Sequence, residues 1–267
     1  MFIQIKHPVH EKDIWNWYNN INYELQKNFL SIEEKKVLKE YYKEAGLLRG
    51  WRRSFFRHHF ARTFTKAANY LLDETSSPYI IDLGCGFGTQ SLCFAIMGAH
   101  VLAIDMDETA LEIFLKRKKF YESLLNRPLH IELHHCNIFD FDFSNKKPIT
   151  GIYSMFAFNM MQPSERLIAI LSKYSQSRCR LAILDGNNQS WLSRFIPTRR
   201  RENCLSPFEL EQQLSKHFFM VVDQTPGFCI PPVIWSILPN SFLRTVDNLL
   251  GRFAFFAISY QTLAIKQ

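Results

Sequence analysis

The sequence predicts an α/β protein with a doubly wound, mostly parallel β-sheet, and three observations support this. From residue 78 to the C-terminus, apolar segments typical of strands alternate with segments of helical periodicity. The first strand, Tyr79–Leu83, runs into a turn with glycine at three alternate positions, and a helix begins near Thr89. The second strand, Val101–Asp105, ends in a carboxylate, as is typical of the second strand in nucleotide-binding sheets.

The turn contains Gly84, Gly86 and Gly88. Glycine tolerates positive φ, and without a Cβ atom its backbone can come within contact distance of a ligand. The helix that follows would direct its unpaired N–H groups at the same ligand. An acid at the tip of the second strand accepts hydrogen bonds from the hydroxyls of a ribose, so the turn and Asp105 predict one adenosine site.

The spacing of the glycines distinguishes between adenosine cofactors. The NAD fingerprint G-x-G-x-x-G does not match, because here Gly84-x-Gly86-x-Gly88 follows Asp82. In this the sequence resembles the class I S-adenosylmethionine (SAM)-dependent methyltransferases, whose first motif is E/D-x-G-x-G-x-G. The resemblance covers residues 78–184 well and the C-terminal third loosely. It implies a Rossmann-like seven-stranded sheet of order 3-2-1-4-5-7-6 with the last strand antiparallel, SAM as cofactor and S-adenosylhomocysteine (SAH) as product.

The resemblance also implies a set of cofactor-binding residues. In the family, a residue at the end of the third strand bonds the adenine amino group and the next residue packs on the ring. Asn137 and Ile138 stand at these positions, with an amide in place of the common Asp. An acid often found in the fourth strand is replaced by Gly151. The full set is Asp82, Gly84, Cys85, Gly86, Gly88, Asp105, Met106, Asn137, Ile138 and Phe156.

The first 77 residues lie outside the resemblance and predict a helical extension or lid, followed by a methyltransferase domain over residues 78–267. Three helices are expected between residues 10 and 75, with a capping box at Ser31-x-x-Glu34. A basic and aromatic segment with Trp51, Arg52 and Arg53 joins two of them, and we expect it to bind substrate or the carboxylate of SAM. The alternative is an aromatic core with solvated arginines.

The substrate side is expected at the strand tips, because ligands of doubly wound sheets bind beyond the carboxyl ends of the strands. Asn159 and Asn187 are candidates there, although Asn187 could instead form an Asx turn. An apolar insertion over residues 226–257, with Trp235, predicts a substrate wall, a membrane-edge element or core packing. No general base is evident: His134, His135 and Asp185 are candidates by position, and the histidines equally suit an exposed strand face.

Composition limits the remaining choices. A net charge of +7 favours anionic partners or only aids solubility. The basic run over residues 116–119 suits the C-terminal end of a helix, where the macrodipole favours cations, so no partner is needed. Six scattered cysteines without metal-ligand spacing predict reduced thiols and no metal site. Because the sequence has no evident signal peptide or transmembrane run, we expect a cytoplasmic protein. It could be free or bound at the periphery of a membrane.

These features favour methylation of a small or lipid-like molecule. A first alternative is methylation of tRNA or rRNA, suggested by the positive charge. It is weakened because Asn159-Met-Met-Gln stands where enzymes that methylate base amino groups carry Asn/Asp-Pro-Pro-Tyr/Phe. The other alternative is a non-catalytic SAM-binding subunit that supports a partner.

Overall fold

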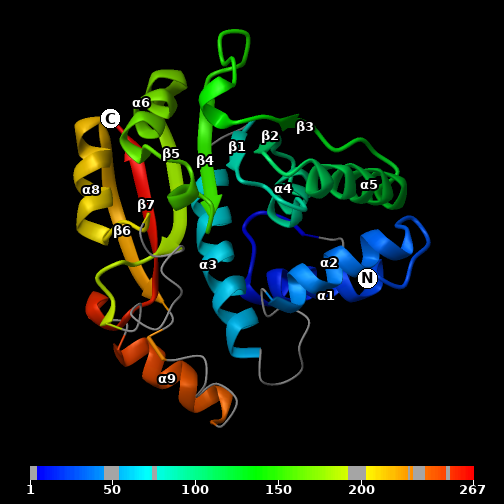
Figure 1. Cartoon of the computed structure of the whole chain (residues 1–267), viewed down its shortest axis with the longest axis horizontal. Helices are drawn as coiled ribbons and strands as arrows, with labels where there is room; N and C mark the ends of the chain where they lie inside the picture. The colour runs from blue at the N-terminus through cyan, green and yellow to red at the C-terminus, as the bar shows by residue number, and fades with distance from the viewer. Residues whose placement is uncertain are drawn as a thin grey trace. The chain divides into compact units, whose positions relative to one another are not determined.

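The computed structural model describes residues 5–44, 54–73, 77–191, 203–227, 229–230, 238–250 and 253–267. Its seven strands form one sheet in the order β3-β2-β1-β4-β5-β7-β6 (Figure 1). Strand β7 is antiparallel to both β5 and β6, so the predicted order and the antiparallel last strand are confirmed. The strands are β1 Tyr79–Leu83, β2 His100–Asp105, β3 Ile131–His135, β4 Ile149–Met155, β5 Ser175–Gly186, β6 Phe219–Gly227 and β7 Ser259–Lys266.

The helices begin where the sequence places capping residues. Ser31 and Glu34 bond each other's backbone N–H reciprocally, and Ser206 and Glu209 do the same. Asp107 accepts the backbone N–H of Ala110. The labelled helices are α1 Glu11–Glu24, α2 Ile32–Glu44, α3 Ser54–Leu72, α4 Thr89–Ile96, α5 Glu108–Leu125, α6 Ser164–Tyr174, α8 Pro207–Lys216 and α9 Asn240–Leu250.

The chain divides into two compact units, Met1–Asn137 and Ile138–Gln267. The helices that precede the first strand therefore fold together with β1, β2 and β3. The predicted division into an extension over residues 1–77 and a domain over residues 78–267 stays a prediction.

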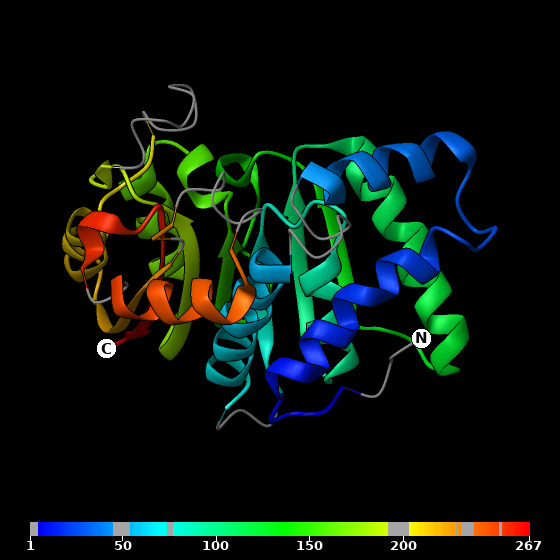
Figure 2. The same ribbon diagram turned by 90° about the horizontal axis from the view of Figure 1, so that it is seen from below.

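In the unit Met1–Asn137, β1 pairs in parallel with β2, and β2 with β3. Every residue of β1 is buried, as expected for a parallel strand covered on both faces. Helices α1 and α2 lie beside α5 (Figure 2), where Phe29 stacks on Phe120 at 4.2 Å between ring centroids. The helical extension is thus packed against the helix that follows β2.

In the unit Ile138–Gln267, β4 pairs in parallel with β5, and the antiparallel pairs β5/β7 and β6/β7 complete the sheet. The predicted insertion over residues 226–257 contains α9, which is anchored by the buried Leu243 and by Asp247, whose Oδ1 accepts the N–H of Cys229 at 2.7 Å. Trp235 lies outside the described residues.

Three general features of the described residues bear on function. None of their helices is both long and apolar enough to cross a membrane. All six cysteines are free thiols. Within the described ranges, no group of three or more His, Cys, Asp or Glu side chains is placed to hold a metal ion.

Candidate functional site

The glycine turn is fixed to the end of β2 by its own backbone. Gly84, Gly86 and Gly88 all have positive φ, at 69°, 49° and 74°. The N–H groups of Gly84 and Cys85 both donate to the carbonyl oxygen of Ile104, at 2.9 and 3.2 Å. The N–H of Gly86 donates to Oδ2 of Asp105 at 2.7 Å. The turn and the acid on the neighbouring strand, which the sequence paired as one adenosine site, are therefore in direct contact.

Two of these glycines are needed for different reasons. A Cβ atom on Gly88 would lie 2.3 Å from three ring carbons of Phe114, so Gly88 allows close packing of the turn on α5. Among the described residues, a Cβ atom on Gly86 would meet only the hydroxyl of Tyr41, at 3.9 Å. The described part of the chain therefore leaves space at Gly86, where a ligand can approach the backbone of the turn.

Asp82 provides a buried carboxylate at the end of β1. Its exposed fraction is 3%, and Oδ2 accepts a hydrogen bond from the Ser91 hydroxyl at 2.5 Å. Burial, with a smaller contribution from the charge of Asp105, raises the pKa of Asp82 to about 7 against the opposing effect of the Ser91 hydrogen bond. An approaching cationic group would favour the ionised form of this carboxylate.

Asp105 organises the loops that surround it. Its Oδ1 accepts the N–H of Asp107 at 2.9 Å, and each carboxylate oxygen keeps a further lone pair for a ligand. Met106 follows as an exposed apolar side chain, 67% accessible. The N–H of Cys136 donates to the carbonyl oxygen of Asp105, which brings Asn137 beside this acid. The predicted cofactor residues from Asp82 to Asn137 are thus gathered at the carboxyl ends of β1, β2 and β3.

Tyr41 is a residue of this site that the sequence analysis missed. It lies on α2, and its ring packs 4.8 Å from that of Phe87 between centroids. Burial and the nearby charges, including Asp105 and Asp82, raise the pKa of Tyr41 well above its ordinary value. The residue is 46% exposed, and its hydroxyl lies 3.9 Å from the position that a Cβ atom on Gly86 would take. Trp51, Arg52 and Arg53, the predicted contacts from the extension, lie outside the described residues.

Arg117 belongs to the basic run over residues 116–119, for which the sequence analysis expected no partner, and the structure gives it one. Its side chain is fully buried and forms an ion pair with the equally buried Glu24, with Nε and Oε2 2.6 Å apart. Burial disfavours the charged guanidinium, but the Glu24 carboxylate together with the neighbouring Tyr42 and Tyr121 raises the pKa of Arg117 above its ordinary value. The helical period that places Arg117 in line with Ala110, Ile113, Phe114 and Tyr121 was the signal for a buried position.

In the unit Ile138–Gln267, the predicted substrate residues meet at the tips of β4 and β5. Asp185 is 3% exposed and accepts the N–H groups of Asn159 and Gly186, each at 2.8 Å. Burial raises its pKa to about 7, while these two bonds oppose the shift. Asn159 also donates to Sγ of Cys204 at 3.1 Å. The carboxylate of Asp185 thus holds the β4 tip, and its catalytic role stays a prediction.

The side chain of Asn187 is engaged in hydrogen bonds, whereas that of Phe156 is partly exposed. The side chain of Asn187 donates to the carbonyl oxygen of Ala257 and accepts from the N–H of Gln189, which is the Asx-turn alternative. Phe156 has φ of +54°, rare for an aromatic residue, and is 39% exposed. Backbone strain of this kind is often kept at ligand sites. Ile138, expected against the adenine ring, is 3% exposed and begins a short 3-10 helix.

The two histidine candidates lie on β3. His135 pairs in register with Asp105, and its Nε2 lies 3.0 Å from the carbonyl oxygen of Met106. His134 lies 3.8 Å from Glu132. Met106 follows β2 and Glu132 lies on β3, so each histidine contacts a residue of its own or the adjacent strand. These contacts suit strand residues with one exposed face. A catalytic role for either histidine stays a prediction.

The residues at the glycine turn fit an adenosyl sulfonium donor such as SAM. The side chain that Gly86 lacks leaves space for a ligand, and the carboxylate of Asp105 can accept from ribose hydroxyls. The Asp82 carboxylate and the amide groups at the start of α4 offer opposite charge to the ammonium and carboxylate groups that SAM carries.

Comparisons with known proteins agree with this geometry. Residues 80–176 match the family model of a methyltransferase domain. A structure from Listeria monocytogenes, described as an S-adenosylmethionine-dependent methyltransferase, has 15% identity and a TM-score of 0.54 over 78% of this chain and 99% of that chain. The plantazolicin methyltransferase BpumL in complex with SAH has 17% identity and a TM-score of 0.53, with 96% of this chain and 97% of that chain covered.

A third similar structure is the phosphoethanolamine N-methyltransferase 2 of Haemonchus contortus with SAH, at 12% identity and a TM-score of 0.55, covering 77% of this chain and 52% of that chain. At these identities the structures establish a shared fold. Residues 80–176 are thus similar in sequence to a methyltransferase domain, and the chain has the Rossmann-like fold that it shares with SAM-dependent methyltransferases.

Proposed function

We propose that this protein transfers a methyl group from SAM to a small or lipid-like molecule. The observation that carries the proposal is the glycine turn in contact with Asp105, with space left at Gly86 by the described part of the chain and Asp82 buried beside the turn. SAM, when bound, supplies a methyl group on a sulfonium that is open to in-line displacement. The protein contributes binding, alignment of the acceptor and exclusion of water.

A lipid-like acceptor is supported by exposed apolar side chains in and after α9. Phe242 and Leu249 are 53% and 55% exposed on this helix, and Phe253 and Phe255, which follow it, are 60% and 57% exposed. Large apolar side chains gathered in one segment mark surfaces that bind partners, ligands or lipid interfaces. This segment belongs to the apolar insertion over residues 226–257 predicted from the sequence.

Small acceptors are also supported by the similar structures. BpumL is seen in complex with desmethylPZN analogs and SAH, and the Haemonchus contortus enzyme with phosphomonomethylethanolamine and SAH. Both structures pair the cofactor product with a small molecule. We infer an acceptor of comparable size for this chain.

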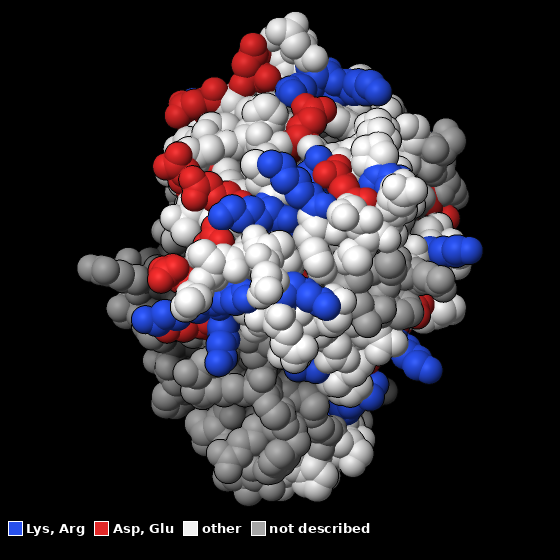
Figure 3. Space-filling view, turned by 90° about the vertical axis from the view of Figure 1, so that its right-hand side faces the viewer, with Lys and Arg blue, Asp and Glu red and all other residues white. Residues whose placement is uncertain are grey.

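The charge distribution gives less support to a nucleic acid acceptor. Figure 3 shows basic side chains interspersed with acidic ones on the face drawn. Lys116 pairs with Glu34 at 2.5 Å and Lys118 with Glu122 at 2.9 Å, so part of the basic run is neutralised locally. A nucleic acid footprint needs a continuous basic surface.

The test is to incubate the protein with SAM labelled in the methyl group and with a cell extract separated into lipids, small aqueous molecules and RNA. We expect label in the lipid or the small-molecule fraction. Label in RNA would contradict the proposal and favour the RNA alternative. Binding of SAH without transfer to any fraction would favour the non-catalytic alternative.

The lipid part of the proposal has a separate test on α9. We expect a Phe242→Ser/Leu249→Ser double variant to lose retention on phospholipid vesicles, because it removes exposed apolar surface. Phe208→Ser on α8 is the matched control, since Phe208 is a 61% exposed phenylalanine of another helix. Equal retention of both variants and the unaltered protein would leave small soluble acceptors as the substrate class.

A further inference from the structure

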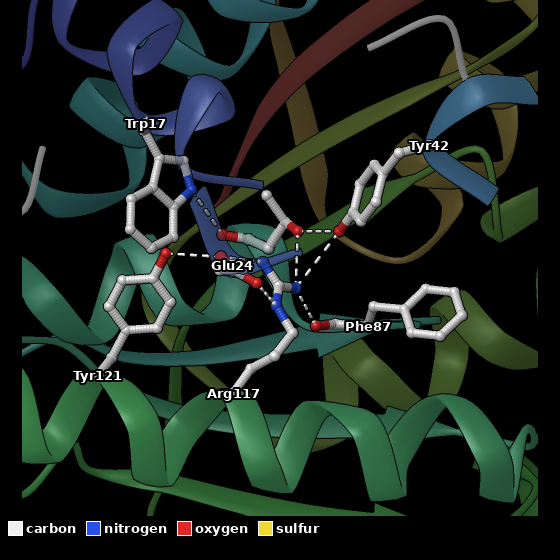
Figure 4. A network of polar contacts seen from close by, with 7 residues as sticks. Trp17, Glu24, Tyr42, Phe87, Arg117 and Tyr121 are labelled. Atoms are coloured by element: carbon white, nitrogen blue, oxygen red, sulfur yellow. Dashed lines mark hydrogen bonds and ion pairs between the residues drawn. The ribbon is translucent and has the colours of Figure 1, made fainter. Parts of the chain in front are cut away.

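The Glu24–Arg117 pair joins the helical extension to the glycine turn through one guanidinium group (Figure 4). Nε and one terminal nitrogen of Arg117 hold the two oxygens of Glu24, at 2.6 and 3.0 Å. This two-point arrangement fixes the plane of the guanidinium. Tyr121 donates a further bond to Glu24 at 2.6 Å, so the carboxylate is itself held in place.

The remaining terminal nitrogen of Arg117 is directed at the turn. It donates to the carbonyl oxygen of Phe87 and, at 3.0 Å, to the hydroxyl oxygen of Thr89. These two residues flank Gly88 and connect Gly86 to α4. Arg117 therefore holds the second half of the turn on both sides of Gly88, while Asp105 holds Gly86 itself.

Two aromatic residues of the extension contact the same Thr89. The indole Nε1 of Trp17 donates to the Thr89 carbonyl oxygen at 2.9 Å. The hydroxyl of Tyr42 bonds the Thr89 hydroxyl and lies 3.3 Å from Arg117. Helices α1, α2 and α5 thus all bond the start of α4, and the side chains involved are buried.

Burial makes this network a strict geometric constraint. Arg117 and Glu24 have no accessible side-chain surface, so water cannot replace a lost bond. Buried charges are strongly held to their partners because leaving one unpaired is costly. An arrangement of this kind selects one shape of the turn. A turn that already has this shape binds a ligand without the entropic cost of becoming ordered first.

From these contacts we infer that Arg117, held by Glu24, is a positioning residue that fixes the shape of the glycine turn for SAM. The helical extension is then a constituent of the cofactor site and not a detachable cover. The inference rests on SAM binding at this turn, as the proposed function does. Arg117 acts through Phe87 and Thr89, and contact with the methyl acceptor is not part of its role.

The test uses the full chain and two mild variants. Arg117→Lys keeps the charge that Glu24 needs but lacks the fork that reaches Phe87 and Thr89. Tyr42→Phe keeps the ring and removes only the hydroxyl that bonds Thr89. Lys116→Met is the matched control, since it breaks the Lys116–Glu34 pair between α5 and α2, which involves the neighbour of Arg117 on the surface side of α5.

Two readouts are compared. In the unliganded proteins, hydrogen exchange of the peptide over residues 84–91 should be faster in Arg117→Lys and Tyr42→Phe than in the control. The SAH dissociation constant, from calorimetry on proteins with native circular dichroism, should rise by about tenfold in Arg117→Lys and less in Tyr42→Phe. The control should match the unaltered protein in both.

Wild-type exchange and wild-type SAH affinity in both variants would overturn the inference. If Arg117→Lys fails to fold, Tyr42→Phe decides alone by the same criteria. If the unaltered protein does not bind SAH, the proposed function fails, and the exchange measurement still decides whether Arg117 orders the turn.

Discussion

Asp82 combines two properties: it lies beside the glycine turn, and burial resists its ionisation. Its carboxyl is 3% exposed, with a pKa raised to about 7 from an ordinary value of 3.8. Between these values the unfolded chain is ionised and the folded chain holds a proton. The free energy of unfolding therefore falls as pH rises through this window and levels off above about pH 7.

The Asp82→Asn substitution removes this pH dependence. Asn can still accept the Ser91 hydrogen bond, so any constant cost of the change is the same at every pH. Relative to the unaltered protein, we expect the stability of Asp82→Asn to rise by about 2–3 kcal/mol between pH 5 and pH 8. Urea unfolding at both pH values measures it. An equal difference at the two pH values would contradict the assigned shift.

Some residues of the candidate site could be predicted from the sequence, and others could not. Asp82, Gly86 and Asp105 could be placed because spacing along adjacent strands fixes their position at one edge of the sheet. The partner of Arg117 was missed because the macrodipole of its helix already accounted for a basic run, although the helical period aligned Arg117 with buried neighbours. Tyr41 could not be found, because nothing local shows which face of a preceding helix returns to the turn.

The turn from β1 to α4 carries a second prediction, which concerns packing. Gly88→Ala would place a methyl group 2.3 Å from the Phe114 ring, whereas Gly98→Ala, at φ of +99°, meets no atom of the described residues within 4 Å. Both pay the backbone cost of positive φ, and only Gly88→Ala adds overpacking. We expect Gly88→Ala to be the less stable by about 1–3 kcal/mol in thermal or urea unfolding. Equal destabilisation would show that Phe114 yields without cost.

Element boundaries followed from capping chemistry and from strand patterns. The helix starts at Ser31, Asp107 and Ser206 were predictable because each side chain satisfies a backbone N–H of its own first turn. Strand β5 begins at Ser175, earlier than the apolar run from Leu181 indicates, since its first residues are largely exposed and polar. Exposed polar strand residues carry no hydrophobic signal.

For the whole molecule, strand order was predictable while the role of the first 77 residues was not. The order came from the family resemblance, which extends from the glycine turn across the sheet, and it is confirmed. The extension has no counterpart in that resemblance, and its link to the turn depends on pairs far apart in sequence, such as Glu24 and Arg117. Long-range ion pairs leave no periodic pattern in either partner's segment.

The Gly86 side of the turn is where we place the adenosyl donor. Gly86→Ala and Gly98→Ala both place a Cβ atom at positive φ without a close contact to any described residue, so we expect similar losses of stability, about 1 kcal/mol each. Calorimetric titration with SAH distinguishes them. We predict that the unaltered protein and Gly98→Ala bind SAH and that Gly86→Ala loses at least about tenfold in affinity. Unchanged SAH affinity in a folded Gly86→Ala protein would contradict this placement.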